Sequence, residues 1–300
     1  MLIPVAVEQD SGAGYVIDET DGALTCVVTG PWTGAAEPLL AIGTVDGLVL
    51  NYAMGFCESD LSFIKAWPLR RLSILDRSLV DLHPLRRVGA TLEELSVQAA
   101  PGARLDLGDT PRLRFITGSW ELIRSTVNAW DQLQSIITMN YDDTDLLPLV
   151  DQSRLSVLTI KEANRLESLR GVAGLVGLEK LGIHLARRLT DVGDVASCAT
   201  TLSEFRLEYC SRIMKLDPIA PLTRLTALAV ADCRSVDSLR PLSSLAALEK
   251  FLAWGSTRIM DADLSPLLSL PRLNELRMKS RREYRPSVKE VQSELVPPVA

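Results

Sequence analysis

The sequence predicts an α/β solenoid, a fold in which successive coils stack and each coil adds one short strand to a parallel sheet. A 23-residue pattern occurs twice in succession, starting at Leu202 and at Leu225, and the two copies match in character at nine positions. Only 5% of the residues are aromatic, so leucine is expected to fill the core. Self-similarity at a period of roughly 20 to 50 residues is typical of stacked repeats.

The same register extends in both directions from these two copies. Leucines that open a coil recur at spacings of 20 to 25 residues, which predicts about ten to eleven coils over residues 45–280. These leucines are Leu69, Leu92, Leu113, Leu133, Leu155, Leu178, Leu202, Leu225, Leu248 and Leu273. A degenerate first coil begins at Val45, with Leu48 and Leu50 in its strand.

The strand of each coil is predicted to bury two of its side chains. Because strand side chains alternate, the fourth and sixth residues should face the core and the third, fifth and seventh should face solvent. Prolines such as Pro218 and Pro241 fall on the return segment, which is therefore expected to be irregular or 3₁₀. The ninth residues Cys210 and Cys233 should stack as buried free thiols.

The repeat resembles the leucine-rich repeat family. The resemblance rests on the LxxLxL strand motif followed by Cys at the ninth place, as in Leu202, Phe205, Leu207 and Cys210. Pro and an apolar residue near the seventeenth and eighteenth places resemble internalin or phosphatase-regulator repeats. The resemblance implies a horseshoe with a parallel concave sheet and a convex side without long helices. It is weakest over residues 92–154, where irregular coils are expected.

The two ends of the chain do not carry the repeat. Apolar segments at 2–7, 14–17 and 24–28, with turns at Asp10-Ser11-Gly12 and Asp21-Gly22, predict a β-rich N-terminal cap over residues 1–44. An acidic docking module is the alternative there. Within residues 281–300, Ser287 and Glu290 form a capping box that predicts a short helix ended by Pro297-Pro298. We expect this helix to cover the last coil, with membrane or partner-helix binding as the alternative.

Charge and cysteine content narrow the possible partners and compartment. The formal net charge of −6 argues against general nucleic-acid binding, although residues 272–289 contain seven basic side chains. Five cysteines without a CxxC pair favour a reducing compartment. The start of the chain has no signal-peptide pattern, and no apolar run is long enough to span a bilayer. The sequence thus predicts a cytoplasmic protein, with a composition that suggests a bacterial source.

No catalytic motif is found in the sequence. The histidines, His83 and His184, are five coils apart, which is too far for a shared metal. Asp142, Asp143 and Asp145 could hold a hard cation, but they lack the spacing of a known calcium loop. We therefore predict a protein that is not an enzyme and that needs no cofactor or metal. An enzyme or metal-dependent protein with a site near Asp142 is the alternative.

The concave sheet is the predicted binding surface for a partner protein, since solenoids of this kind bind on their open sheet. Large or charged residues at solvent-facing strand positions and the adjacent eighth place are the candidate contacts. They are Trp120, Ile137, Met139, Lys161, His184, Arg206, Glu208, Tyr209, Leu252, Trp254, Arg277 and Lys279. The predicted function is a non-catalytic interaction module, such as an immunity or inhibitor protein or a regulatory subunit, present as a monomer or partner-bound. A secreted effector and a purely structural solenoid are alternatives.

Overall fold

The computed structural model describes residues 14–20 and 22–295. The chain forms two compact units, Met1–Leu133 and Gln134–Ala300. The strand predicted at 2–7, the turn at 10–12, Asp21 and the helix stop at Pro297-Pro298 lie outside the described residues.

The first unit begins with an antiparallel hairpin, β1 with β2, and continues as parallel strands in the order β2, β3, β4, β5, β6. The predictions of strands at 14–17 and 24–28 are therefore confirmed. The strands are β1 (Tyr15–Thr20), β2 (Ala23–Val28), β3 (Gly47–Asn51), β4 (Arg71–Leu75), β5 (Glu94–Gln98) and β6 (Phe115–Ser119). The helical segments are α1 (Glu37–Ala41), α2 (Trp120–Ile123) and the 3₁₀ turns η1 (Tyr52–Met54), η2 (His83–Arg87), η3 (Gly89–Thr91) and η4 (Val127–Ala129).

The second unit is a parallel ladder in the order β7, β8, β9, β10, β11, β13, β15, with β12 and β14 paired separately. Its strands are β7 (Ser135–Met139), β8 (Val157–Lys161), β9 (Lys180–His184), β10 (Glu204–Glu208), β11 (Ala227–Ala231), β12 (Ser235–Val236), β13 (Lys250–Ala253), β14 (Arg258–Ile259) and β15 (Glu275–Met278). Its helical segments are η5 (Leu147–Leu149), η6 (Val172–Gly174), η7 (Gly193–Cys198), η8 (Asp217–Ile219), η9 (Arg240–Ser244), α3 (Ser265–Leu268) and α4 (Val288–Ser293).

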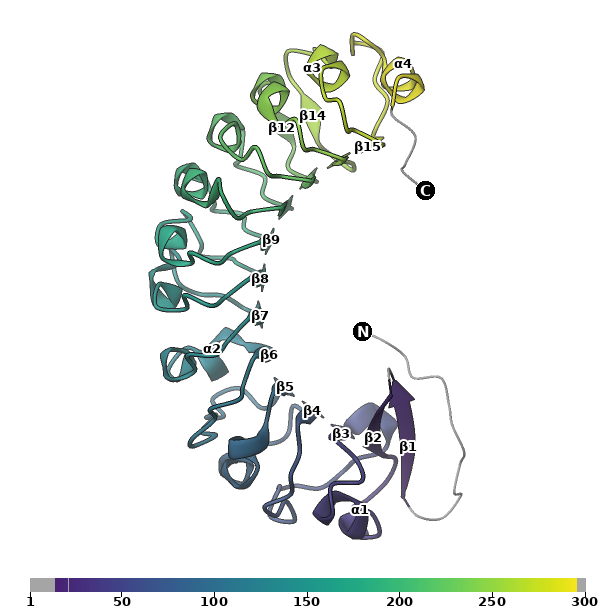
Figure 1. Cartoon of the computed structure of the whole chain (residues 1–300), viewed down its shortest axis with the longest axis vertical. Coiled ribbons are helices and arrows are strands. Elements are labelled where there is room, and N and C mark those ends of the chain that lie inside the picture. The colour runs from purple at the N-terminus through teal and green to yellow at the C-terminus, as the bar shows by residue number, and fades with distance from the viewer. Residues whose placement is uncertain (1–13, 21, 296–300) are drawn as a thin grey trace. The chain divides into compact units, whose positions relative to one another are not determined.

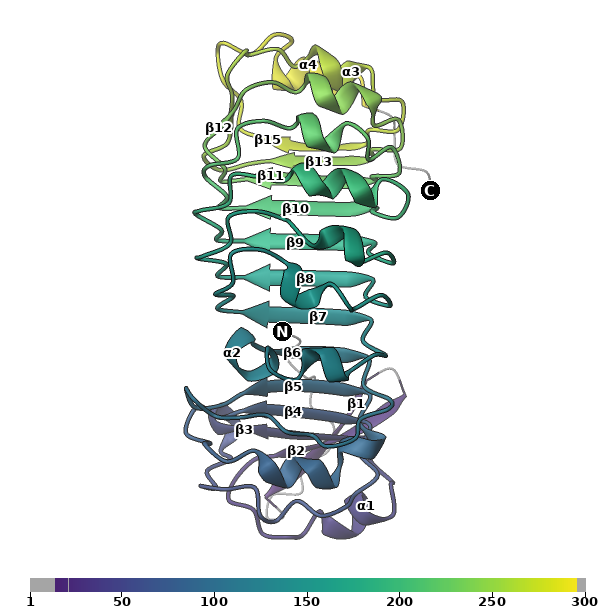
Figure 2. The same cartoon turned by 90° about the vertical axis from the view of Figure 1, so that its left-hand side faces the viewer.

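The return segments are short 3₁₀ turns or single helical turns, as predicted. In each unit the strands lie on one side and the helical segments of the return arcs lie on the opposite side, whereas α4 lies at the end of the second unit (Figure 1 and Figure 2). Pro218 and Pro241 lie in the first turn of η8 and η9. Proline fits that position because its fixed φ suits a helical turn and its missing N–H has no partner to lose there.

The core follows the predicted register. Leu202, Phe205 and Leu207, the first, fourth and sixth residues of one coil, are all 0% exposed. Burying each such side chain contributes roughly 1.5 to 3 kcal/mol. Thr138 is an exception at a sixth place, since it is fully buried and its hydroxyl has no hydrogen-bond partner among the described residues.

A left-handed residue ends the strand segment of each regular coil in the second unit. The eighth residues have φ between 51° and 69°, namely Asn140, Glu162, Leu185, Tyr209, Asp232 and Gly255. The backbone N–H of Tyr209, for example, donates to the Ala231 carbonyl of the next coil at 2.9 Å. This turn brings the ninth residue inward, and Cys210 and Cys233 are accordingly buried free thiols, as predicted.

The C-terminal helix is capped as predicted. The Ser287 hydroxyl accepts a hydrogen bond from the Glu290 N–H at 3.2 Å, and the Glu290 carboxylate accepts one from the Ser287 N–H at 2.7 Å. From α4, Gln292 Nε2 donates to the Leu276 carbonyl at 3.1 Å. The helix therefore satisfies part of the outer edge of β15, which limits addition of a further strand.

Candidate functional site

The candidate site is the solvent-facing side of the sheet in the second unit. We define this open face as the third, fifth and seventh residues of the coils that contain β7, β8, β9, β10, β11, β13 and β15. It carries six cationic residues, Lys161, Lys180, Arg206, Lys250, Arg277 and Lys279. It carries three anionic ones, Glu204, Glu208 and Glu275. With His184 neutral, its formal charge of +3 is opposite in sign to that of the whole chain, −6.

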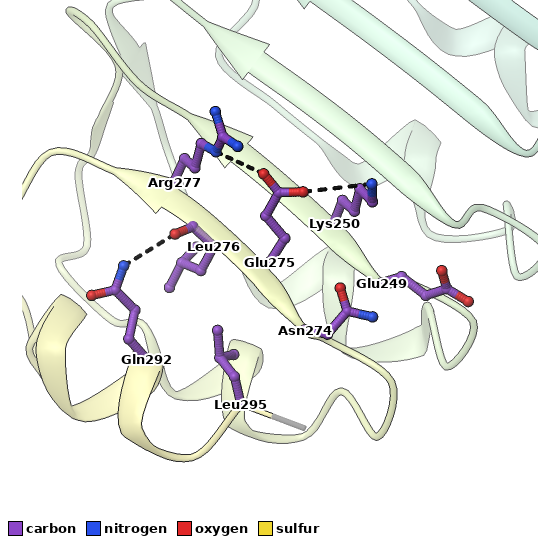
Figure 3. A pocket seen from close by; sticks show the side chains of 8 residues that line it. All are labelled: Glu249, Lys250, Asn274, Glu275, Leu276, Arg277, Gln292 and Leu295. Carbon is purple, nitrogen blue, oxygen red and sulfur yellow. Dashed lines mark hydrogen bonds and ion pairs between the residues drawn. The ribbon is translucent and has the colours of Figure 1, made fainter. Parts of the chain in front are cut away.

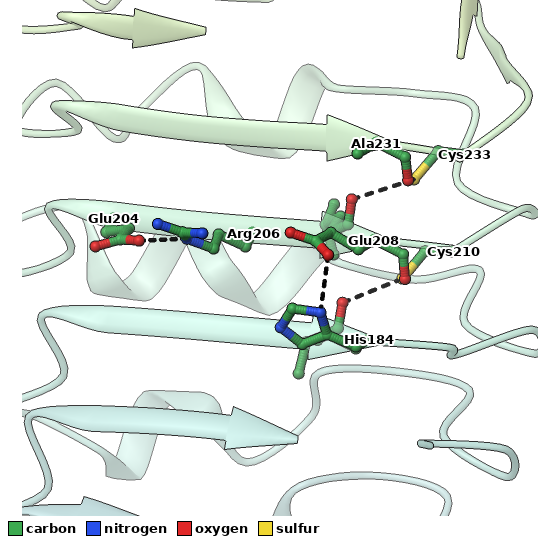
Figure 4. A network of polar contacts seen from close by, with 9 residues as sticks. His184, Glu204, Arg206, Glu208, Cys210, Ala231 and Cys233 are labelled. Carbon is green, nitrogen blue, oxygen red and sulfur yellow. Dashed lines mark hydrogen bonds and ion pairs between the residues drawn. The ribbon is translucent and has the colours of Figure 1, made fainter. Parts of the chain in front are cut away.

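Ion pairs organise the charged side chains of β9 and β10 (Figure 4). Glu204 accepts a hydrogen bond from Nε of Arg206, and its other oxygen lies 3.9 Å from Lys180 Nζ. Nδ1 of His184 lies 3.1 Å from Glu208 Oε2. These partners fix the direction of side chains that would otherwise sample many rotamers in water.

A second group of ion pairs lies on β13 and β15 (Figure 3). Glu275 Oε1 lies 2.6 Å from Arg277 Nε, and its Oε2 lies 3.6 Å from Lys250 Nζ. A hollow of about 810 Å³ adjoins this group, lined also by Leu276, Gln292 and Leu295. Charged and apolar groups thus meet at this edge of the open face.

Two aromatic side chains are exposed in coils that also carry these ion pairs. Tyr209 is 50% exposed because its left-handed backbone directs the side chain away from the core, and Trp254 is 37% exposed at the end of β13. Leu252 is half-buried on β13, where it pairs in register with Arg277 of β15. Ile137 and Met139 are half-buried on β7, whereas Lys161 and Lys279 are exposed. The structure therefore places all these predicted contacts on the second unit's solvent-facing side.

Trp120 is a wrong prediction. It is 0% exposed and belongs to the first unit, where it begins α2. In the regular coils the eighth residue is left-handed and points outward, but here the chain enters a right-handed helical turn at that residue. Arg124 N donates to the Trp120 carbonyl at 2.9 Å, and the indole is packed inside. Irregular structure was expected in this part of the chain, but its effect on Trp120 was not predicted.

The charged residues at the third place of the open-face coils were not among the predicted contacts. Lys180, Glu204, Lys250 and Glu275 connect the ion pairs described above. A usable signal was present, because Glu204 and Glu275 each precede an arginine by two residues. Side chains two apart on a strand share a face, so the pairing could have been predicted.

Among the aspartates near residue 142, Asp145 has a structural role. Asp145 lies 2.8 Å from Arg170 and also accepts a hydrogen bond from the Leu147 N–H at 3.1 Å. The Tyr141 hydroxyl donates to the Asp145 carbonyl at 2.7 Å. Across residues 14–20 and 22–295, no group of three or more His, Cys, Asp or Glu side chains has the arrangement of a metal site.

Three buried cysteines, Cys26, Cys198 and Cys210, have raised pKa values that disfavour the thiolate, whereas the hydrogen bond with Cys210 lowers the pKa of the buried Cys233. Burial raises the pKa of Cys26 to about 12, and burial also raises the pKa of Cys198. The pKa of Cys210 is raised by its hydrogen bond with Cys233 and by burial. A thiol nucleophile requires the opposite shift.

None of the helices in the described part of the chain combines the length and apolar character of a membrane span.

Comparison with known proteins identifies the fold. No family model and no curated protein matches the chain. Similar solved structures include an internalin from Listeria monocytogenes str. 4b F2365, with 16% identity, a TM-score of 0.55, and coverage of 91% of this chain and 73% of that chain. A TLR13–ssRNA13 complex has 14% identity, a TM-score of 0.54, and coverage of 79% of this chain and 43% of that chain. Both are leucine-rich repeat proteins, and the predicted leucine-rich repeat fold is confirmed.

Proposed function

We propose that this leucine-rich repeat chain is a non-catalytic protein-interaction module that binds another protein on its open face. One observation carries the proposal: Trp254 on the open face is 37% exposed, Tyr209 in the turn directly after β10 is 50% exposed, and the strands of their coils carry glutamate ion pairs with arginine and lysine. Tyr, Trp and Arg supply most of the binding energy in protein interfaces. These side chains project from hydrogen-bonded strands or the turns that follow them, so little conformational freedom is lost when a partner binds.

A protein fits this face better than a nucleic acid does. Affinity for a phosphate backbone depends on many cations that are free of compensating charge. On the open face, Glu204 and Glu275 each neutralise part of the charge of two cations. A surface that alternates charge with aromatic and aliphatic groups matches the mixed composition of protein interfaces.

The proposal also covers the biological role of this interaction module and the cellular compartment in which it works. An immunity or inhibitor protein and a regulatory subunit both need a preformed binding surface and no catalytic centre. The five cysteines are all unpaired, which supports a reducing compartment, and we propose the bacterial cytoplasm.

Affinity capture from extracts of source cells tests the proposal. Wild-type protein is compared with Trp254→Ala and Tyr209→Ala, and bound proteins are quantified by mass spectrometry. Val176→Ala is the matched control, because Val176 is 66% exposed and lies outside the open face. We expect one or more partners whose recovery falls about tenfold or more in each aromatic variant and is unchanged in the control.

Equal recovery with all three variants would place binding elsewhere on the chain and contradict the proposal. Thermal unfolding of each variant is measured in parallel, so that a loss of binding is not confused with a loss of folded protein.

A further inference from the structure

Four residues form a continuous row across the open face. Arg206 of β10 pairs in register with Ala229 of β11, Ala229 with Leu252 of β13, and Leu252 with Arg277 of β15. Neighbouring strands lie about 4.8 Å apart, so three steps separate the arginine backbones by about 14 Å. The row therefore has a cation at each end and two apolar residues between them.

The two arginines are held in the same way. In each case Nε faces Oε1 of the glutamate two residues earlier, and a lysine from the preceding strand faces Oε2 of that glutamate. The terminal guanidinium nitrogens have no hydrogen-bond partner among residues 14–20 and 22–295. The side chains of Arg206 and Arg277 are 46% and 66% exposed. Each guanidinium is thus oriented by Nε and presents its outer two nitrogens to solvent (Figure 3 and Figure 4).

The two residues in the middle of the row are apolar, and their side chains project little from the sheet. Ala229 is 2% exposed, and Leu252 is half-buried. Since Ala229 has only a methyl group, a partner side chain can approach the sheet closely between the two arginines. Trp254 lies two residues beyond Leu252 and offers further apolar area.

We propose that this row binds an extended acidic segment of the partner protein, with carboxylates at positions i and i+4 and an apolar side chain at i+2. This inference rests on the proposed function. An extended chain rises about 3.3 Å per residue, so four residues span about 13 Å, close to the separation of the arginines. Residues i, i+2 and i+4 of an extended chain share one side, which faces the row.

The chemistry at each end selects a carboxylate. The outer nitrogens of a guanidinium match the two oxygens of a carboxylate and form paired charge-assisted hydrogen bonds. Each Lys–Glu–Arg group has a net charge of only +1, which suits a single carboxylate. A polyanion such as RNA would bring further phosphates toward Glu204 and Glu275, which repel them.

Peptide display tests the inference. A library of random 12-residue peptides is selected on immobilised wild-type protein, and the selected peptides are synthesised and measured by fluorescence anisotropy. The test variant is Arg206→Gln with Arg277→Gln, which removes both guanidinium groups and keeps similar side-chain length. The matched control is Arg240→Gln, an exposed arginine of η9 outside the open face. Unfolding midpoints are compared to confirm that all variants fold.

We expect the selected peptides to be enriched in acidic, apolar and acidic residues at i, i+2 and i+4. Their affinity should fall about tenfold for each arginine replaced and remain unchanged in the control. Moving the two acidic residues to adjacent positions should weaken binding by a similar factor.

Other outcomes overturn the inference in distinguishable ways. Peptides that require Trp254 but lack this motif, or that bind the double variant equally well, overturn the acidic-segment inference and leave the proposed function standing. Peptides that depend on neither Trp254 nor the arginines, or a selection that yields none, contradict both. A 12-nucleotide single-stranded RNA that binds more tightly than the selected peptides, and loses affinity in the double variant, would assign the row to nucleic acid.

Discussion

Trp120 and Tyr209 occupy the same eighth place in their coils but differ completely in exposure. Tyr209 follows β10 with φ of 57° and is 50% exposed, whereas Trp120 follows β6, begins α2 and is 0% exposed. Position in the repeat therefore does not by itself decide which side chains a partner can reach. The handedness of the backbone at the eighth residue does.

The backbone explains the difference between the two coils. A left-handed residue turns the chain out of the strand, so the eighth side chain points out and the ninth, such as Cys210, points in. A right-handed helical turn at the same place sends the eighth side chain inward. Because this switch changes no hydrophobic spacing, it is difficult to detect from a pattern of leucines.

Truncating the two aromatic residues gives the largest expected contrast. Trp120→Ala removes a fully buried indole and should lower the free energy of unfolding by about 3 to 5 kcal/mol. Tyr209→Ala should change it by about 0.5 kcal/mol or less, since the ring is half exposed. Chemical denaturation of both variants measures the contrast, and equal losses would show that the two side chains are equally buried.

Gly255 offers a test of the left-handed corner itself. It has φ of 69°, and an added Cβ would lie 2.2 Å from Asp232 Oδ1. Gly255→Ala should therefore lower the free energy of unfolding by about 1 to 3 kcal/mol. Gly102→Ala is the control, because Gly102 has φ of 79° with no atom near the added Cβ. If Gly102→Ala lowers the free energy of unfolding less than Gly255→Ala does, the difference measures the steric clash with Asp232. An unchanged free energy of unfolding in Gly255→Ala would contradict the corner geometry.

The glycine variant should be more stable than the alanine variant at residue 209, and less stable than the alanine variant at residue 120. At residue 209, glycine adopts the left-handed conformation without strain, so Tyr209→Gly should be more stable than Tyr209→Ala by about 1 kcal/mol. At residue 120 the backbone is helical, and Trp120→Gly should be less stable than Trp120→Ala by about 1 kcal/mol. Denaturation midpoints of the four variants measure the order of stability at each site. The same order at both sites would remove the proposed distinction in backbone.

Thiol labelling sharpens the comparison because it reports the exposure of each eighth residue directly. With iodoacetamide at pH 8, Tyr209→Cys should react as readily as the exposed Cys57, and Trp120→Cys should react only on unfolding. Mass spectrometry of peptides locates the label. Rapid labelling of Trp120→Cys in the folded protein would contradict its burial.

The pH dependence of Cys26 follows from its burial. Its pKa is raised to about 12 in the folded protein from an ordinary value of 9.0, so the folded state retains the proton longer. The contribution of Cys26 to the free energy of unfolding is therefore fully present below pH 9, and it is lost as the pH rises toward 12. Cys26 should therefore remain unlabelled at pH 10 while Cys57 reacts, and equal rates would contradict the shift.

The coil register could be predicted from sequence because it depends on burial alone. Leu202, Phe205 and Leu207 recur at fixed spacing, and a stack of coils is the arrangement that buries them all. The capping box at Ser287 was equally predictable, since its two hydrogen bonds involve residues three apart. The coil register is determined by a regular spacing of apolar residues, and the helix cap is determined by neighbouring residues, so both can be read from the sequence.

The open face was only partly predictable. Asn140, Asp232 and Gly255 are residue types that favour a left-handed backbone, but Leu185 and Tyr209 are not, so local preference indicates the corner in some coils only. Tertiary hydrogen bonds between coils fix it in the others. The row from Arg206 to Arg277 was predictable, because it occupies the fifth place of four successive coils, and the pairing of the four strands confirms that register.

Hydroxyl-radical footprinting of the folded protein tests the central claim most directly, because one experiment reports on both eighth places and on the open face. We predict rapid oxidation of Tyr209 and Trp254 and protection of Trp120, in line with their exposures of 50%, 37% and 0%. Oxidation of Trp120 at the rate of Trp254, or protection of Tyr209 and Trp254 in the isolated protein, would contradict the account.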